Sequence, residues 1–543
     1  MRATRAVFTL MLVPFGACLA AEKVHTQSGV VEGAASADGR IRIFKGIPFA
    51  APPVGDLRWQ PPQPVSPWAG VRKATEFGAR CMQGRIYEDM VFRDPGPSED
   101  CLYLNVWTPG SSAEAGLPVM VWIYGGGFQA GSASEPRQDG ENLAKKGVIV
   151  VSLNYRLGVF GFFSHPELTK ESPHHASGNY GLLDQVAALE WVHKNIAAFG
   201  GNPDNVTIFG ESAGSISVSA QMASPLSKGL LKQAIGQSGG AFMLTPRMPS
   251  VSETQQTGAE FAKSLGVSTL HALRAMPADQ VLKAALKDKT KTYRFWPNVD
   301  GYFFPQTPAA IYAAGKQAHV ALLGGWNADE HDHTTFLETP EATKENYAAK
   351  VRAEYGRHAD EVLTLYAGTN QKEMKESARD LASDQFIAYS TWKWLDMQLA
   401  TGESPVYRYH FEQAPPTPTG EPDRGAYHSA DIEYVFETLD WKRLPWTADD
   451  RKLSDIISSY WTNFAKRGNP NGPGLPEWPS YSKTDHYAVM HLQVGGVNNG
   501  EKGRAGSQEI PYAAPDPRRP RYKLLDRIAD ERAEKHKSSA MER

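Results

Sequence analysis

The sequence predicts an α/β protein with a mostly parallel central sheet, helices on both faces of the sheet and helical insertions. Apolar, β-branched runs at 117–123 and 147–153 predict buried strands that end at loops. Helical periodicity covers 180–196, and residues 205–222 have the pattern of a strand, a sharp turn and a helix. Strands that alternate with helices form parallel sheets, because each crossover helix packs on a sheet face.

Two mostly helical regions, about 245–312 and 340–397, interrupt this alternation and are interpreted as insertions on the sheet. The segment 521–536 predicts an exposed amphipathic helix. No internal repeat is present in the sequence. We therefore expect residues 22–543 to form a single domain.

The N-terminus has the pattern of an export signal. A short basic start is followed by an apolar stretch with small residues at its end, which predicts a signal peptide over residues 1–21 and a secreted or periplasmic protein. The alternative is a membrane anchor, but the stretch is short and Pro14 interrupts it. No later run is apolar enough for a stable membrane span.

The net charge of −3 provides no basic field for nucleic acid, so we expect no nucleic-acid partner. The sequence does not fix an oligomeric state. Cys81 and Cys101 remain if Cys18 leaves with the signal peptide. An even number of cysteines in an oxidising compartment favours a disulfide between them, and two free buried thiols are the alternative.

The most specific motif is "IFGESAGS", with Gly210, Ser212 and Gly214. It follows a predicted strand and begins a predicted helix, which is the context of a nucleophile elbow. Such a turn raises the serine hydroxyl above the sheet edge and directs the N–H of Ala213 toward the reacting oxygen. The alternative is an ordinary glycine-rich turn.

A second glycine motif, "YGGGF" at 124–128, follows the predicted strand at 117–123. Glycines at this position let backbone N–H groups approach a substrate closely, as an oxyanion hole requires. The alternative is a flexible turn.

Together with these motifs, "SEDCLYLNVWTP", "GWNADE" and "AYHSADIEYVF" resemble the type-B carboxylesterases of the α/β-hydrolase fold, which include bacterial para-nitrobenzyl esterases and cholinesterases. The resemblance extends from residue 29 to about residue 479. It implies a catalytic triad of Ser212, Glu330 and His428, in the chain order of that fold.

The resemblance also implies further roles for matching positions. The oxyanion-hole donors would be the N–H groups of Gly126, Gly127 and Ala213. Cys81 and Cys101 would form a disulfide, and two structural ion pairs would join Arg58 with Glu99 and Arg156 with Asp184.

The segment 329–333 contains three acids and two histidines, and Glu330 is the position that matches the acid of the family. His331 stands where a glycine is usual, and His333 lies near a position that is aromatic in cholinesterases, so both are candidates for substrate binding. The alternative is a metal site, since two histidines one residue apart share a face on a strand. We expect no metal, because no further ligand cluster is apparent in the sequence.

Substrate choice rests on weaker patterns. Tyr293, Phe295 and Trp296 match the acyl-pocket segment of the family and favour an apolar acyl group, although they are equally consistent with core packing. The loop between the two cysteines lacks the tryptophan that holds choline in cholinesterases and carries Arg85 and Arg93. This composition argues against choline esters and favours esters that bear a carboxylate.

We therefore expect a secreted serine carboxylesterase that hydrolyses small-molecule esters through an acyl-enzyme on Ser212, with no cofactor. One alternative is a lipase-like enzyme, or a specialised detoxifying esterase for a bulky or carboxylate-bearing ester. Another is a non-catalytic relative with an adhesion role, which the presence of both Ser212 and His428 disfavours.

Overall fold

The structure, a computed structural model, describes residues 22–110, 116–244, 248–267, 269–287, 294–494 and 511–541. The expected signal peptide, residues 1–21, lies outside the described residues. None of the helices in the described ranges is both long enough and apolar enough to cross a bilayer.

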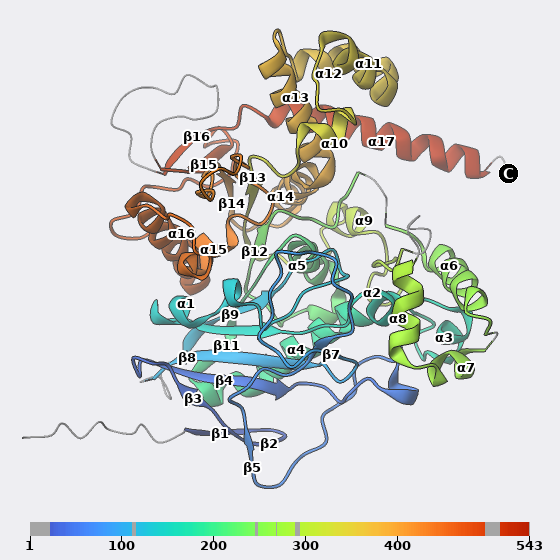
Figure 1. Ribbon diagram of the computed structural model, residues 1–543, viewed down its shortest axis with the longest axis vertical. Helices are drawn as coiled ribbons and strands as arrows, with labels where there is room; N and C mark the ends of the chain where they lie inside the picture. Colours follow the sequence, from blue (N-terminus) through green and yellow to red (C-terminus); the bar gives the residue numbers. More distant parts are fainter. Residues whose placement is uncertain are drawn as a thin grey trace, which may run out of the picture.

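One large sheet forms the centre of the described chain (Figure 1). Its strands are β3 (Ala34–Ala35), β4 (Ile41–Pro48), β8 (Tyr103–Pro109), β9 (Leu117–Ile123), β10 (Ile149–Leu153), β11 (Gly201–Glu211), β12 (Gln233–Gln237), β13 (Ala321–Asn327), β14 (Val406–Phe411), β15 (Ala488–Leu492) and β16 (Tyr512–Pro515). The order across the sheet is β16-β15-β14-β13-β12-β11-β9-β10-β8-β4-β3.

Neighbouring strands from β15 to β10 are parallel, and antiparallel strands flank this centre at both edges. The mostly parallel sheet predicted from the sequence is therefore confirmed. Smaller sheets contain β1 (Lys23–Thr26), β2 (Gly29–Glu32) and β5 (Val71–Lys73), and β6 (Arg80–Cys81) with β7 (Pro97–Ser98).

Helices pack on both faces of the large sheet, as expected. One face carries α1 (Glu141–Lys145) and α16 (Ala448–Arg467), and the other carries α4 (Tyr180–Asn195), α5 (Ala213–Ala223) and α14 (Tyr389–Thr401). Every residue of β10 is buried, because a parallel strand covered on both faces has no solvent-facing side.

The predicted insertions are helical (Figure 1). The first contains α6 (Val251–Ser264), α7 (Leu270–Ala275), α8 (Ala278–Lys287) and α9 (Pro308–Ala313), near the short helices α2 (Gly158–Phe162) and α3 (Pro166–Glu171). The second contains α10 (His333–Leu337), α11 (Lys344–Tyr355), α12 (Ala359–Leu365) and α13 (Gln371–Ser383). The short α15 (Ile432–Phe436) packs on α16.

The C-terminal helix α17 (Arg519–Met541) contacts α12 and α14 (Figure 1). Tyr522, Leu525 and Ile528 are almost completely buried on this side. The expectation of an exposed helix is therefore wrong for the first turns of α17, whose apolar side packs on α12, on α14 and on Trp326 of β13.

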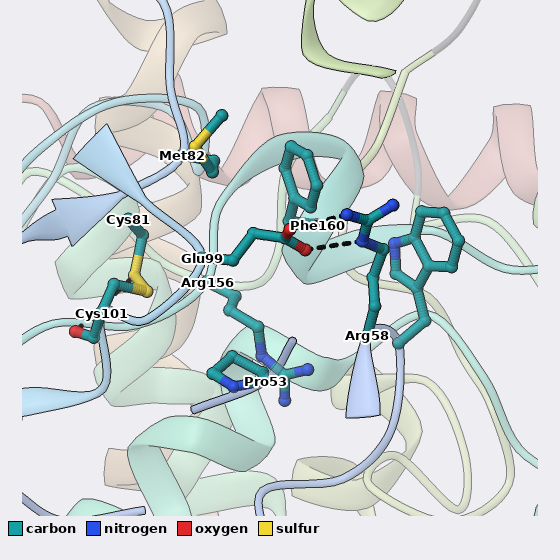
Figure 2. A pocket seen from close by; sticks show the side chains of 9 residues that line it. Pro53, Arg58, Cys81, Met82, Glu99, Cys101, Arg156 and Phe160 are labelled. Atoms are coloured by element: carbon teal, nitrogen blue, oxygen red, sulfur yellow. Dashed lines mark hydrogen bonds and ion pairs between the residues drawn. A yellow bond between two sulfur atoms is a disulfide. The ribbon is translucent and has the colours of Figure 1, made fainter. Parts of the chain in front are cut away.

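Cys81 and Cys101 form a disulfide, as the sequence predicted (Figure 2). Beside it, both N–H groups of the Arg58 fork donate to the Glu99 carboxylate at 2.6 Å. Arg156 likewise donates to Asp184 from Nε at 2.8 Å and from a terminal nitrogen at 2.7 Å. Both expected ion pairs are therefore present. The small cavity in Figure 2 is lined by Arg58, Glu99, Arg156 and the disulfide, together with Pro53, Trp59, Met82 and Phe160.

The disulfide closes a loop that spans 20 positions of sequence. We expect the double variant Cys81→Ser/Cys101→Ser to lose about 3 kcal/mol of unfolding free energy, because the unfolded chain gains freedom. Equilibrium urea unfolding measures this as a lower transition midpoint. Reductant should lower the wild-type midpoint and leave that of the variant unchanged. Equal midpoints for the two proteins without reductant would contradict the prediction.

Candidate active site

Ser212 occupies a sharp turn between β11 and α5. Its φ of 55° and ψ of −122° lie in a region that residues with side chains rarely adopt. A β-carbon on Gly210 would lie 2.6 Å from the backbone of Gly214, and one on Gly214 would lie 1.9 Å from the carbonyl oxygen of Ile123. Glycine is therefore required at both positions, and the geometry is that of the predicted elbow.

The glycine loop after β9 lies directly beside this turn. A β-carbon on Gly125 would lie 3.0 Å from the β-carbon of Ser212. Gly126 and Gly127 have φ values of +103° and +62°, which suit glycine. Within the described ranges, the N–H groups of Gly126, Gly127 and Ala213 have no hydrogen-bond acceptor. Unsatisfied donors near a serine hydroxyl suit a substrate oxyanion.

A continuous hydrogen-bond chain joins Ser212, His428 and Glu330. His428 Nε2 lies 3.0 Å from Ser212 Oγ, and His428 Nδ1 lies 2.5 Å from Glu330 Oε2. Glu330 is 3% exposed, whereas the His428 side chain keeps 26% of its surface exposed. The three residues that the family resemblance implied as a triad are therefore in contact, although they lie far apart in the sequence.

Asp329 fixes the loop that carries His428. Its N–H donates to the Ala426 carbonyl at 3.0 Å, and its Oδ2 accepts from the Ala426 N–H at 2.8 Å. Arg379 pairs with its other oxygen at 2.8 Å. A β-carbon on Gly425 would lie 2.2 Å from Asp329 Oδ2. Asp329 is thus a positioning residue that ties the loop after β13 to the loop after β14.

Two further buried carboxyl groups near His428 were missed in the sequence. Glu211 Oε1 lies 3.2 Å from His428 Nε2, and burial raises the pKa of Glu211. Asp431 accepts hydrogen bonds from Gln237 and Tyr409, and burial raises its pKa to about 6. The signal for Glu211 was its place directly before Ser212, because β11 ends there and both side chains face the same sheet edge.

These carboxyl groups set the protonation of the imidazole. Burial alone would lower the pKa of His428, but the adjacent carboxylates of Glu211 and Glu330 more than offset this effect and raise it. The raised pKa suits His428 to accept a proton from the adjacent Ser212 hydroxyl.

His331 and His333 follow Glu330 at the end of the loop after β13 and have different contacts. The His331 ring contacts Phe386 at 4.4 Å, and Phe386 contacts the His428 ring at 5.1 Å, so His331 lies one ring away from the chain of hydrogen bonds. His333 Nε2 lies 3.1 Å from the Pro340 carbonyl, and its Nδ1 lies 3.1 Å from Asp332. Within the described ranges, His333 makes no hydrogen bond or ring contact with Ser212, Glu330 or His428, and it is the first residue of α10.

Among the described residues, the one group with metal-ligand geometry lies elsewhere and contains His410, Glu412 and His491. Glu412 Oε1 lies 2.7 Å and 2.8 Å from Nδ1 of the two histidines. Arg518, always a donor, faces His410 Nε2 at 3.4 Å, which favours the tautomer with hydrogen on Nδ1. These side chains therefore form a hydrogen-bond network that joins β14 and β15.

The expected acyl-pocket residues are only partly described. Tyr293 lies outside the described residues. Phe295 is 8% exposed and packs between Phe163 and Phe261, so its surroundings are those of a core residue. Trp296 is half-buried and lies edge to face with Phe128 at 4.8 Å, directly after the glycine loop.

The model of the family described as "Carboxylesterase family" matches residues 20–508. The chain is 38% identical over 486 residues to fumonisin B1 esterase of Sphingopyxis macrogoltabida, covering 87% of this chain and 86% of that protein. It is 37% identical over 494 residues to para-nitrobenzyl esterase of Bacillus subtilis (strain 168), covering 88% and 96%. A solved thermophilic PNB esterase superposes with a TM-score of 0.77 at 34% identity and covers 93% of this chain and 99% of its own. The family resemblance and the α/β-hydrolase fold are confirmed.

We expect Glu211→Gln to lower the pKa of His428, because it removes one of the two carboxylates that stabilise the imidazolium. An NMR titration of isotope-labelled histidine measures this, with the His428 signal assigned from its loss in a His428→Gln spectrum. Glu412→Gln is the matched control, since this buried carboxyl contacts His410 and His491 instead. An unchanged or raised pKa of His428 in Glu211→Gln would refute the assignment.

Proposed function

The chain belongs to the carboxylesterase family and is a carboxylic ester hydrolase, and from this premise we propose that it works through an acyl-enzyme formed on Ser212. The observation that carries the proposal is the chain of hydrogen bonds from Glu330 through His428 to Ser212. Nucleophile, base and orienting acid in this arrangement are the requirements for acyl transfer by serine.

In the first step, Ser212 Oγ attacks the ester carbonyl carbon while His428 Nε2 accepts its proton. The tetrahedral intermediate expels the alcohol, which takes the proton from His428. Water then attacks the acyl-enzyme, gives a proton to His428, and releases the acid as Ser212 regains its hydrogen. Glu330 keeps hydrogen on Nδ1 and stabilises the imidazolium.

The oxyanion would accept hydrogen bonds from the N–H groups of Gly126, Gly127 and Ala213. Their lack of other acceptors supports this role, because they need no rearrangement when charge develops. Each such donor contributes about 3 kcal/mol to transition-state stabilisation in related chemistry. No step requires a cofactor or a metal ion.

We also propose that residues 1–21 act as a signal peptide, that the protein is exported, and that residues 22–543 form one domain. The disulfide supports export, because such bonds persist in oxidising compartments. His331 and Trp296 are proposed to contact the substrate, since each lies one ring from the hydrogen-bond chain or the glycine loop.

The names of the relatives indicate small ester substrates of varied structure, such as fumonisin B1 and para-nitrobenzyl esters. We propose a small-molecule ester as substrate here. A lipase-like preference has one observation in its favour: Ile86, Tyr87 and Val91 of the loop between the cysteines are apolar and exposed. Rates on short soluble esters and on long emulsified esters distinguish the two.

Ser212→Ala should lower kcat by about 10⁴-fold or more, because no acyl-enzyme can form. Hydrolysis of 4-nitrophenyl butyrate measures the loss, and the thermal unfolding midpoint confirms that the variant is folded. Ser215→Ala is the control, since that buried hydroxyl donates to the Gly239 carbonyl and lies outside the chain of hydrogen bonds. Turnover near that of the wild type in Ser212→Ala would exclude the mechanism.

A further inference from the structure

The arginines of the loop between the cysteines do not offer a built carboxylate site. Arg93 donates to Asp139 at 2.8 Å and to the Ser134 carbonyl at 2.9 Å, and its guanidinium lies 4.7 Å from the Phe77 ring centroid. It is therefore committed to the fold. Arg85 is exposed and forms no hydrogen bond or ion pair with the described part of the chain, so water already satisfies its charge.

Arg294 differs from every other arginine discussed above. It is half-buried, its guanidinium lies 4.1 Å from the Trp296 ring centroid, and burial alone lowers its pKa. No carboxylate of the described residues pairs with it, whereas the buried Arg58 and Arg156 each hold a bidentate carboxylate. A cation that has lost part of its water and gained only a ring contact keeps N–H donors available to a ligand.

The position of Arg294 connects it to the reacting centre. Trp296, on which its guanidinium lies, packs edge to face on Phe128 at 4.8 Å. Phe128 directly follows Gly127 in the glycine loop and also has a positive φ, of 57°. Two ring contacts thus separate the guanidinium from the residue next to the expected oxyanion donors. A substrate whose acyl or alcohol part extends along Trp296 would bring a terminal group to this guanidinium.

We propose that Arg294 binds a carboxylate carried by the ester substrate, so that the enzyme prefers anionic esters over neutral esters of the same shape. The proposal rests on the proposed function, because it places the carboxylate relative to an ester held at Ser212. Two N–H groups of the guanidinium donate to the two carboxylate oxygens, and the face of the Trp296 ring keeps the guanidinium oriented for this pair. Arg294 is a binding residue in this account and takes no part in proton transfer.

The test uses two isosteric pairs of esters with the full-length protein. In the acyl arm, the mono-4-nitrophenyl ester of adipic acid is compared with the same ester of adipamic acid, in which an amide replaces the carboxylate. In the alcohol arm, 4-carboxyphenyl butyrate is compared with 4-carbamoylphenyl butyrate. The arm in which Arg294→Gln lowers the rate for the carboxylate ester shows whether Arg294 binds a carboxylate on the acyl part or on the alcohol part of the substrate.

Arg294→Gln should lower kcat/KM for the carboxylate ester of one arm by about 10- to 100-fold, the range for a lost hydrogen bond to a charged group, and change its amide partner by less than about twofold. Arg294→Lys should retain part of the preference, because it keeps the charge without the fork. Arg85→Gln is the matched control, an exposed arginine of the neighbouring loop, and should change neither arm.

Three results would overturn the inference: equal losses for acid and amide esters in Arg294→Gln, no loss in either arm, or an equal selective loss in Arg85→Gln. If Arg294→Gln does not fold, Arg294→Lys is the deciding variant. A ratio of acid to amide rates equal to that of the wild type, together with an unchanged salt dependence, is evidence against a paired carboxylate. Hydrolysis of both amide esters by the wild type and its loss in Ser212→Ala separate this failure from failure of the proposed function, for which Ser212→Ala would retain activity.

Discussion

The turn at Ser212 is the constraint on which the rest of the site depends. The chain leaves β11 and enters α5 within one residue, at a φ of 55° that costs conformational energy. The helix can approach this closely only because Gly214 has no side chain, since a β-carbon there would overlap the Ile123 carbonyl. The buried strands on either side hold the strained residue, and its hydroxyl is thereby presented to His428. The glycine loop after β9 packs directly against this turn, so its backbone N–H groups lie beside the Ser212 hydroxyl.

Burial gives the acids around His428 different properties. Glu330 accepts hydrogen bonds from the Asn327 N–H, from Ser238 and from His428, which fix its position beside the imidazole. Glu211 has an oxygen without a hydrogen-bond partner, and burial raises its pKa. Burial and the imidazole therefore act in opposite directions on Glu211: burial raises its pKa and a protonated His428 lowers it, so the two groups favour each other's charged forms.

The sequence predicted the parts of this site that local motifs encode. The elbow at Ser212 and the glycine loop follow from residue types whose backbone requirements are local, and the buried strands follow from apolar runs. His428 and Glu330 were located by resemblance, because nothing local distinguishes a catalytic imidazole. The packing of α17, the Asp139 partner of Arg93 and the isolation of Arg294 were not predictable, since each depends on side chains brought together by the fold over long sequence separations.

The arginines show how the same residue type is divided between fold and site. Arg58 and Arg156 are buried with carboxylates that match their forks, so their desolvation is offset within the chain. Arg294 is partly desolvated with only an aromatic face beside it, so the offset is incomplete. A ligand carboxylate would find a guanidinium that has already lost part of its water and is already oriented. The desolvation that disfavours Arg294 in the free protein is therefore what would make it selective for an anion.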